Sequence, residues 1–309
     1  MTRRLLAAAL LAASLSLPAA PAPAQDRTTV FQMDALDARA FAMGGTLVTL
    51  PRDETALRWN PSLLVFMEAP GVTAGYSTPA SGFGASHTAV AGALLIGREL
   101  PHLSPGVHVR RSAAGAFLMG GGFDLSEGAR WSETQVGAGY AYAIAPYISV
   151  GGTLRLLGNS TAAAGASVSG YAVDAGVAVR LTRTLDLGLG ARNLMSTVKW
   201  KDLGVSEALA NVFAVGLGLN LGGLRCETGM EASSSHAAVL WTGAEADFLD
   251  HQLKARGGMR MHLGSEPRAV PTLGAGFARG RLRVDVAGAF DATEALGVTR
   301  AFSLGYRFK

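Results

Sequence analysis

Residues 171–181 read YAVDAGVAVRL, and this short stretch decides the fold. Large apolar residues occupy one parity and small or charged residues the other: Tyr171, Val173, Val177, Val179 and Leu181 against Ala172, Asp174, Gly176, Ala178 and Arg180. A β-strand points successive side chains to opposite faces. The stretch therefore predicts a strand with one apolar face and one small or polar face.

The same alternation recurs through the second half of the chain, in 147–157, 185–192, 213–220, 282–290 and 302–308. A soluble sandwich with its apolar faces inward would also alternate. Two features favour a membrane barrel instead. The strands run about ten residues, which is the length needed to cross a bilayer at a tilt. The polar parity consists mainly of Gly, Ala, Arg and Asp, whereas solvated sheets prefer Thr, Lys and Glu.

The spacing of these segments predicts an all-β fold, a transmembrane antiparallel β-barrel of about fourteen strands. Connections of one to three residues alternate with longer ones. Outer-membrane barrels have this asymmetry, with short turns at the periplasmic end and longer loops at the exterior end. The longest connections, 114–133 and 193–211, are predicted as exterior loops. The predicted strands are 71–77, 87–96, 106–113, 134–144, 147–157, 169–180, 184–192, 212–220, 223–231, 239–249, 252–262, 269–279, 281–290 and 300–308.

The composition agrees with a surface that faces lipid. Gly contributes 40 of 309 residues and charged residues only 16%, against usual shares of about 7% and 25%. The net charge is +4 and the basic residues are scattered, which excludes nucleic acid as the expected partner. The single cysteine, Cys226, excludes an intrachain disulfide and a cysteine-based metal cluster.

The first 24 residues have the features of a cleaved signal peptide. Arg3 and Arg4 precede the apolar stretch 5–17, which is too short to span a bilayer. Ala22 and Ala24 are placed as in a cleavage site. We therefore expect residues 1–24 to direct export, residues 25–70 to form a separate N-terminal segment, and residues 71–309 to form the barrel in the outer membrane.

Residues 33–67 carry a family resemblance. Arg39-Ala-Phe-Ala-Met-Gly-Gly45, then Asp53-Glu54 and Trp59-Asn60-Pro61, resemble the N-terminal signature of the FadL/PorV superfamily of outer-membrane barrels. The resemblance covers the chain after the signal peptide and is nearer to the compact PorV-like branch. It implies a hatch inside the lumen. The hatch residues that it implies are Gly44, Gly45, Asp53, Trp59, Asn60 and Pro61.

Charged residues on the inward parity form a second candidate site. The charges of neighbouring strands have mixed sign, which predicts either a salt-bridged wall or a polar conduit. Near the short-turn end, Arg281 and Arg283 could meet the acidic residues Asp53 and Glu54 of the hatch. The predicted lumenal charges are Arg225, Glu227, Glu245, Asp247, Lys254, Arg256 and Arg260.

The two longest connections contain large apolar residues that exterior loops in water should lack. They predict either a self-packed lid or a groove for an apolar ligand or partner, lined by Phe117, Trp131, Trp200 and Leu203. The C-terminal aromatic strand 302–308 resembles the signal recognised by the outer-membrane assembly machinery.

No motif indicates an enzyme or a cofactor. The six histidines are scattered, no phosphate-binding loop occurs, and the Gly-x-Gly pairs lie inside alternating strands. The sequence therefore predicts a barrel for passage of small hydrophobic molecules across the outer membrane, as the FadL resemblance implies. Two alternatives stay open: a PorV-like adaptor that binds secreted proteins, and a structural surface barrel.

Overall fold

The computed structural model describes residues 37–45, 47–78, 85–100, 108–124, 130–161, 167–201, 203–291 and 298–308. The predicted signal peptide and residues 25–36 lie outside these ranges. Within them, no helix is both long enough and apolar enough to cross a membrane.

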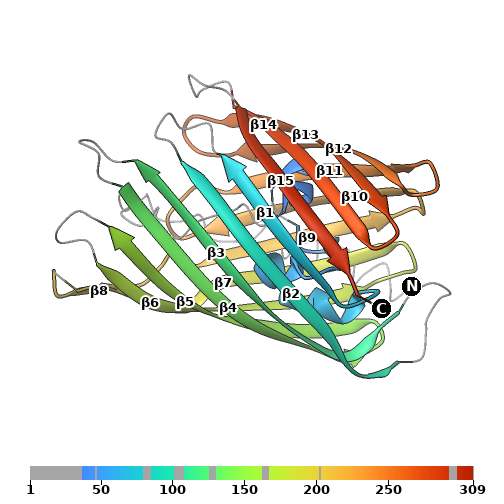
Figure 1. Cartoon of the computed structure of the whole chain (residues 1–309), viewed down its shortest axis with the longest axis horizontal. Coiled ribbons are helices and arrows are strands. Elements are labelled where there is room, and N and C mark those ends of the chain that lie inside the picture. The colour runs from blue at the N-terminus through green and yellow to red at the C-terminus, as the bar shows by residue number, and fades with distance from the viewer. Residues whose placement is uncertain are drawn as a thin grey trace.

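Fourteen antiparallel strands close into a ring, as the sequence predicts (Figure 1). The first strand pairs with the last, from Gly71↔Arg307 to Thr78↔Arg300. A short extra strand, β8, adds to the edge of β7. The strands are β1 (Gly71–Thr78), β2 (Ser86–Glu99), β3 (Arg110–Asp124), β4 (Arg130–Ala145), β5 (Ile148–Thr161), β6 (Val168–Arg180), β7 (Leu185–Trp200), β8 (Val205–Glu207), β9 (Val212–Asn220), β10 (Leu224–Ser233), β11 (Val239–Phe248), β12 (Leu253–His262), β13 (Arg268–Arg279), β14 (Leu282–Phe290) and β15 (Val298–Arg307).

The outer face of the ring is apolar. Large side chains protrude from it on every side, among them Leu94, Leu118, Leu154, Leu273 and Phe302. Small, polar and charged side chains of the opposite parity point inward and are buried. The face assignment of the sequence is confirmed, and the exterior is the kind that a transmembrane barrel presents to lipid.

Two predicted loops are largely strand. The third strand was expected at 106–113, but β3 extends to Asp124 and β4 begins at Arg130. The run 113–122 is rich in Ala and Gly, so it shows little alternation. Strand β7 likewise continues to Trp200, past a bulge at which Val173 pairs with Met195 and Ala175 with Ala191. The two extra residues of the bulge leave the parity unchanged, but beyond it the inward positions hold the apolar Val198 and Trp200 and an outward position holds Lys199. The expected pattern of large apolar residues on the outer face is therefore lost there.

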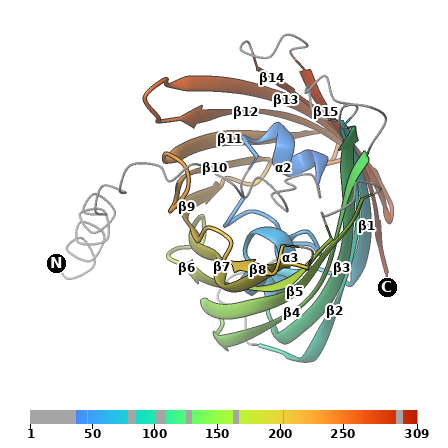
Figure 2. The same cartoon turned by 90° about the vertical axis from the view of Figure 1, so that its left-hand side faces the viewer.

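Residues 37–45 and 47–70, which we call the lumenal segment, lie within the ring (Figure 2). The segment contains two short helices, α2 (Ala38–Ala42) and α3 (Ala56–Trp59), and a 3₁₀-helix, η1 (Pro61–Phe66). Helix η1 packs against β3–β6, whereas α2 packs against β13–β15. The segment therefore spans the lumen from one wall to the opposite one.

The two walls differ in chemistry. On the side of β2–β6, η1 joins inward alanines, Phe117 and Met119 in one apolar cluster. On the side of β10–β14, the inward residues are mainly charged. An apolar contact thus fixes one flank of the lumenal segment, and ionic contacts fix the other.

Candidate functional site: the lumenal segment and its seat in the barrel

Inward glycines of the wall form the seat of the lumenal segment. A Cβ atom added at Gly188 would overlap the carbonyl oxygen of Val48. One added at Gly151 would lie 2.6 Å from the backbone nitrogen of Ser62, and one at Gly243 would lie 2.5 Å from the oxygen of Met43. Substituting these glycines would therefore displace the segment. Similar close approaches occur at Gly176, Gly216, Gly218, Gly258 and Gly274.

The glycine pair of the predicted hatch supplies a backbone conformation that other residues rarely adopt. Gly44 and Gly45 have φ of +95° and +96°, in the region open mainly to glycine. A Cβ on Gly44 would lie 2.9 Å from the oxygen of Met259, and Gly45 faces the side chain of Arg260. This turn therefore brings the segment against β12.

Asn60 ties three pieces of backbone together. Its Nδ2 donates to the carbonyl oxygens of Val48, at 2.8 Å, and Val177 in β6, at 3.1 Å. Its Oδ1 accepts from the backbone N–H of Ser62 and so caps η1. The adjacent Pro61 occupies the first position of η1. A backbone N–H at that position would have no partner within the helix, so its absence in proline costs no hydrogen bond. Trp59 is buried, and the guanidinium carbons of Arg58 and Arg192 lie 5.6 and 5.8 Å from the centre of its ring.

Glu227 of β10 holds the part of the segment that has no secondary structure. Its carboxylate accepts from the backbone N–H groups of Val48 at 2.6 Å, Thr49 at 3.3 Å and Leu50 at 3.0 Å. Unpaired backbone donors are costly to bury. This carboxylate therefore serves as the acceptor that a strand or helix would otherwise supply. The sequence predicted Glu227 in a wall of paired charges, and its role here is different.

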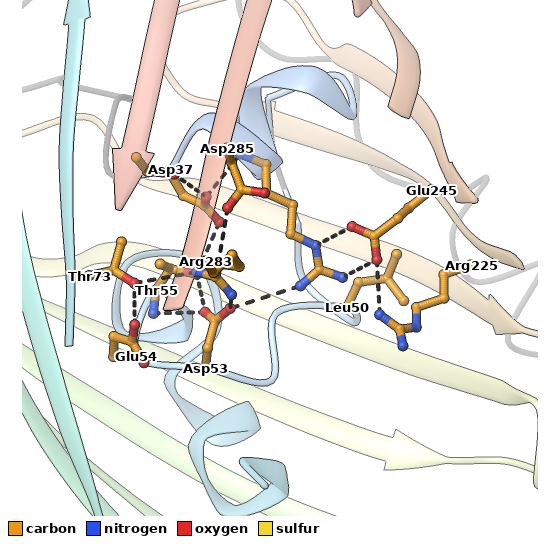
Figure 3. A network of polar contacts seen from close by, with 12 residues as sticks. Asp37, Leu50, Asp53, Glu54, Thr55, Thr73, Arg225, Glu245, Arg283 and Asp285 are labelled. Atoms are coloured by element: carbon orange, nitrogen blue, oxygen red, sulfur yellow. Dashed lines mark hydrogen bonds and ion pairs between the residues drawn. The ribbon is translucent and has the colours of Figure 1, made fainter. Parts of the chain in front are cut away.

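Six side chains of alternating charge form a closed ring of ion pairs, part of which is visible in Figure 3. Arg39 and Asp53 come from the lumenal segment, and the other four come from β11, β12 and β14. Successive N–O distances are 2.9 Å for Arg39–Glu245, 2.6 Å for Glu245–Arg256, 2.8 Å for Arg256–Asp285, 3.0 Å for Asp285–Arg283, 2.7 Å for Arg283–Asp53 and 3.9 Å for Asp53–Arg39.

The ring is buried, so removal of one partner would leave a charge without compensation. Burial opposes the ionisation of Asp53, but the charges of Arg283 and Arg39 together hold the pKa of that carboxyl well below its usual range. Of the ring residues, the sequence indicated Asp53 and Arg283 as possible partners, and it placed Glu245 and Arg256 among the inward charges of neighbouring strands, where they pair at 2.6 Å. It did not indicate that Arg39 lies opposite Glu245, because 206 residues separate them.

Glu54 is a neighbouring carboxyl outside the ring. It accepts a hydrogen bond from the hydroxyl of Thr73 in β1, and it lies close to Gly71. Burial, with a further contribution from the negative charge of Asp53, raises the pKa of Glu54 to about 7. This contact is thus sensitive to protonation near neutral pH.

Three further predicted lumenal charges, Arg225, Asp247 and Lys254, lie beside the ring toward the short turns, whereas Arg260 lies near the other end of β12, against Gly45. Arg225 Nη1 lies 2.9 Å from Glu245, and Lys254 Nζ lies 2.5 Å from Asp247. A cavity of about 770 Å³ opens here, lined by the lumenal segment and by the short-turn ends of β9–β15. We call it the basic vestibule, because arginines and lysine dominate its lining.

Of the four predicted groove residues, the structure brings together two. The rings of Trp131 and Trp200 lie 6.1 Å apart, at the long-loop end of the lumen. They pack with Leu157, Val168, Val198 and Leu209 in a lumen-facing group, which we call the aromatic cluster. Phe117 lies instead on β3, in the cluster around η1, and Leu203 is 66% exposed. The structure therefore does not bring Phe117 and Leu203 together with the two tryptophans.

A polar layer that the sequence analysis missed separates the aromatic cluster from η1. Arg155 is fully buried, and its guanidinium donates to both oxygens of Asp174, at 2.7 and 2.9 Å. It also donates to Gln135 at 3.1 Å and to Asn193. Asn193 has φ of +58°, at the bulge of β7. The sequence signal that could have predicted this layer was an arginine, Arg155, at an inward position of a strand.

No family model and no curated protein matches this chain, but solved structures do. This chain has the FadL-type barrel fold. The toluene transporter TbuX of Ralstonia pickettii is 14% identical with a TM-score of 0.65, over 91% of this chain and 100% of that one. The monoaromatic hydrocarbon channel CymD is 12% identical with a TM-score of 0.66, over 90% and 99%. A FadL homologue from Pseudomonas aeruginosa is 12% identical with a TM-score of 0.60, over 90% and 99%.

Proposed function

We propose that this chain is an outer-membrane barrel through which small hydrophobic molecules pass. The apolar exterior supports a place in the membrane, and the short turns then face the periplasm. The proteins with the same fold named above are a toluene transporter, a hydrocarbon channel and a FadL homologue. The proposal includes no catalytic step, and the cleaved signal peptide remains part of it.

The observation that carries the proposal is the aromatic cluster. An apolar, lumen-facing group that includes two tryptophans stands at the long-loop end, where a molecule from the exterior would first enter. Indole rings offer large apolar contact area. A neutral hydrocarbon would gain free energy there by leaving water.

Passage beyond the cluster requires movement. The Arg155 layer is charged, and the lumenal segment lies behind it. We propose that the passenger moves along the apolar flank, beside η1, because the opposite flank is fixed by the ring of ion pairs. The lumenal segment then acts as a hatch, and its displacement opens the route.

Quenching of tryptophan fluorescence by bromobenzene tests the entry step. In a variant with Trp59→Phe and Trp241→Phe, only the two clustered tryptophans remain. We expect saturable quenching in detergent. Leu157→Asn, inside the aromatic cluster, should weaken apparent binding about tenfold, since an unpaired polar group in an apolar site costs about 1–3 kcal/mol. Leu203→Asn, exposed nearby, should leave it unchanged.

Equal quenching in both asparagine variants would contradict binding at the cluster. Accumulation of radiolabelled toluene by cells that express the wild-type barrel, but not by cells that express the Leu157→Asn variant, tests passage itself. A secreted protein that co-purifies through the long-loop end, with no quenching, would favour the PorV-like adaptor instead.

A further inference from the structure

The basic vestibule has a large excess of positive charge. Nine arginine or lysine side chains and four carboxylates line this cavity among the residues that the structure describes. The ring of ion pairs is balanced, so the excess comes from the others. Outside the ring, six cations and two carboxylates remain in the lining. Of these cations, Arg307 pairs with Glu68 at the exposed rim, and Arg52 pairs at 2.7 Å with Asp186, which lies outside the lining.

The carboxylates in reach are already shared. Asp247 accepts from both Lys254 and His251, and Arg225 approaches it at 3.7 Å. Glu245 faces three arginines, including Arg225. The cations of the vestibule therefore retain net positive potential, which low-dielectric walls concentrate in the cavity.

Positive charge continues from the cavity onto the rim. Arg183 lies in the exposed turn between β6 and β7, and Arg281 lies in the exposed turn between β13 and β14. The phenolic oxygen of Tyr306 accepts from Arg281 at 3.3 Å, and this contact neutralises no charge. The cations therefore form an extended array over several turns and do not converge on one point.

This array faces water on the short-turn side. Arg225 and Lys254 point into the lumen, where lipid headgroups do not reach, and a hydrocarbon passenger has no charge to offer them. A passenger that emerges here is poorly soluble, so it needs an apolar site on a soluble acceptor. An acceptor with an acidic docking surface would be attracted to this mouth.

We propose that the basic vestibule is the docking site for an acidic segment of a soluble periplasmic protein. The inference rests on the proposed function in two respects: the orientation of the barrel, with its short turns in the periplasm, and the need for a soluble protein that accepts the hydrophobic passenger. Association steered by charge should be fast and should weaken steeply with salt.

Fluorescence anisotropy with a fluorescein-labelled hexaglutamate peptide tests the docking site. The full chain in an uncharged detergent should bind this peptide at low salt, but not a labelled Gly-Ser peptide of equal length. Arg183→Glu with Arg281→Glu should weaken binding at least about tenfold, because two attractive charges become repulsive. Both residues lie in exposed turns, so the barrel should still assemble. High salt should abolish binding.

The matched control is Lys199→Glu with Lys201→Glu, which makes the same change in net charge at the long-loop end. Equal losses in the two double variants would mean nonspecific attraction and would overturn the proposal. Displacement of the peptide by equimolar inorganic phosphate would replace it with a small-anion site. Normal bromobenzene quenching without peptide binding would reject the docking site alone, whereas the converse result would reject the proposed function alone.

Discussion

At the scale of single residues, two side chains of different origin solve the same problem. Residues 48–50 belong to no helix or strand, so their buried backbone groups need partners from elsewhere. Glu227 from the wall accepts from their N–H groups, and Asn60 from the segment donates to the carbonyl of Val48. Loss of either side chain should loosen the segment without opening the strand ladder.

The Glu227→Gln variant tests this directly. Hydrogen bonds to a charged acceptor are worth about 1.5–3 kcal/mol each, more than those to a neutral one. We expect amide hydrogen exchange at residues 48–50 to accelerate at least tenfold, while strand amides keep their protection. The control is Asp247→Asn, which also removes an inward charge. In the hydrogen bonds and ion pairs described above, Asp247 contacts only barrel residues. Unchanged exchange in the Gln variant would contradict the role of this carboxylate.

Gly188→Ala tests the glycine seat. The added methyl group would meet the backbone of Val48, so the lumenal segment should shift while the barrel still migrates as folded on unboiled gels. Its exchange at residues 48–50 should rise. Gly158→Ala is the matched control, since a Cβ there would meet open space. The sequence alone shows Gly188 only as a small inward residue, and its contact with the backbone of Val48 is visible only in the structure.

At the scale of elements, the strands and the lumenal segment depend on each other unequally. The strand ladder closes through β1 and β15 and includes no residue of the segment. The segment, by contrast, has only short helices, which would be marginal alone in water. The barrel should therefore survive loss of the segment, whereas the segment needs the barrel.

Deletion of residues 26–66 tests this asymmetry. We expect an assembled barrel with strand-dominated circular dichroism and a conductance in planar bilayers well above that of the full chain, because the lumen loses its filling. The full chain measured in parallel is the reference. Conductance equal to that of the full chain would show that the segment is not what closes the pore.

The lipid-facing wall has its own test. Leu154 is 51% exposed near the middle of β5, and arginine in its place should cost about 2–4 kcal/mol at the bilayer midplane. Leu203 is even more exposed but lies at the long-loop end, so Leu203→Arg should cost less than about 1 kcal/mol. Unfolding in urea measures both. Similar costs would contradict this placement in the membrane.

At the scale of the whole molecule, the lumen has an apolar flank and an ionic flank, and the lumenal segment lies between them. The ionic flank is sensitive to protonation because burial raises the pKa of Glu54 to about 7, and burial raises the pKa of Asp37 as well. Both groups bind a proton more tightly in the seated segment than they would in water. Acidification therefore favours the seated state, and ionisation above the raised pKa opposes it.

Conductance as a function of pH tests this linkage. A shift from 4.5 to about 7 corresponds to at most about 3 kcal/mol. This stabilisation of the seated segment by protonated Glu54 is fully present below about pH 4.5 and is lost as the pH rises through about 7. The segment should therefore open more often at about pH 8 than at about pH 5. Glu54→Gln should reduce the slope, and a slope from the other buried carboxyls, including Asp37, should remain. A wild-type conductance that falls on alkalinisation would have the wrong sign.

Sequence reasoning succeeded where information is local. The strands β9–β15 alternate strictly between short turns, so most of their predicted bounds lie within two residues of the observed ones. It failed in β3, where seven of residues 113–122 are Ala or Gly, and in β7, where the inward positions beyond the bulge are apolar. It could not pair Arg39 with Glu245 or seat Val48 on Gly188, because closure of the ring creates these contacts between distant parts of the chain.

The seam between β1 and β15 sets an order of events. Strand β1 is made early but must wait for the last residues of the chain before both of its edges are satisfied. Until then it is an open edge, ready to pair with another molecule. The lumenal segment precedes β1 in the sequence, and its helices pack against strands on both sides of the ring. A factor that shields the free edge of β1 during this wait would have to release it only when β15 arrives.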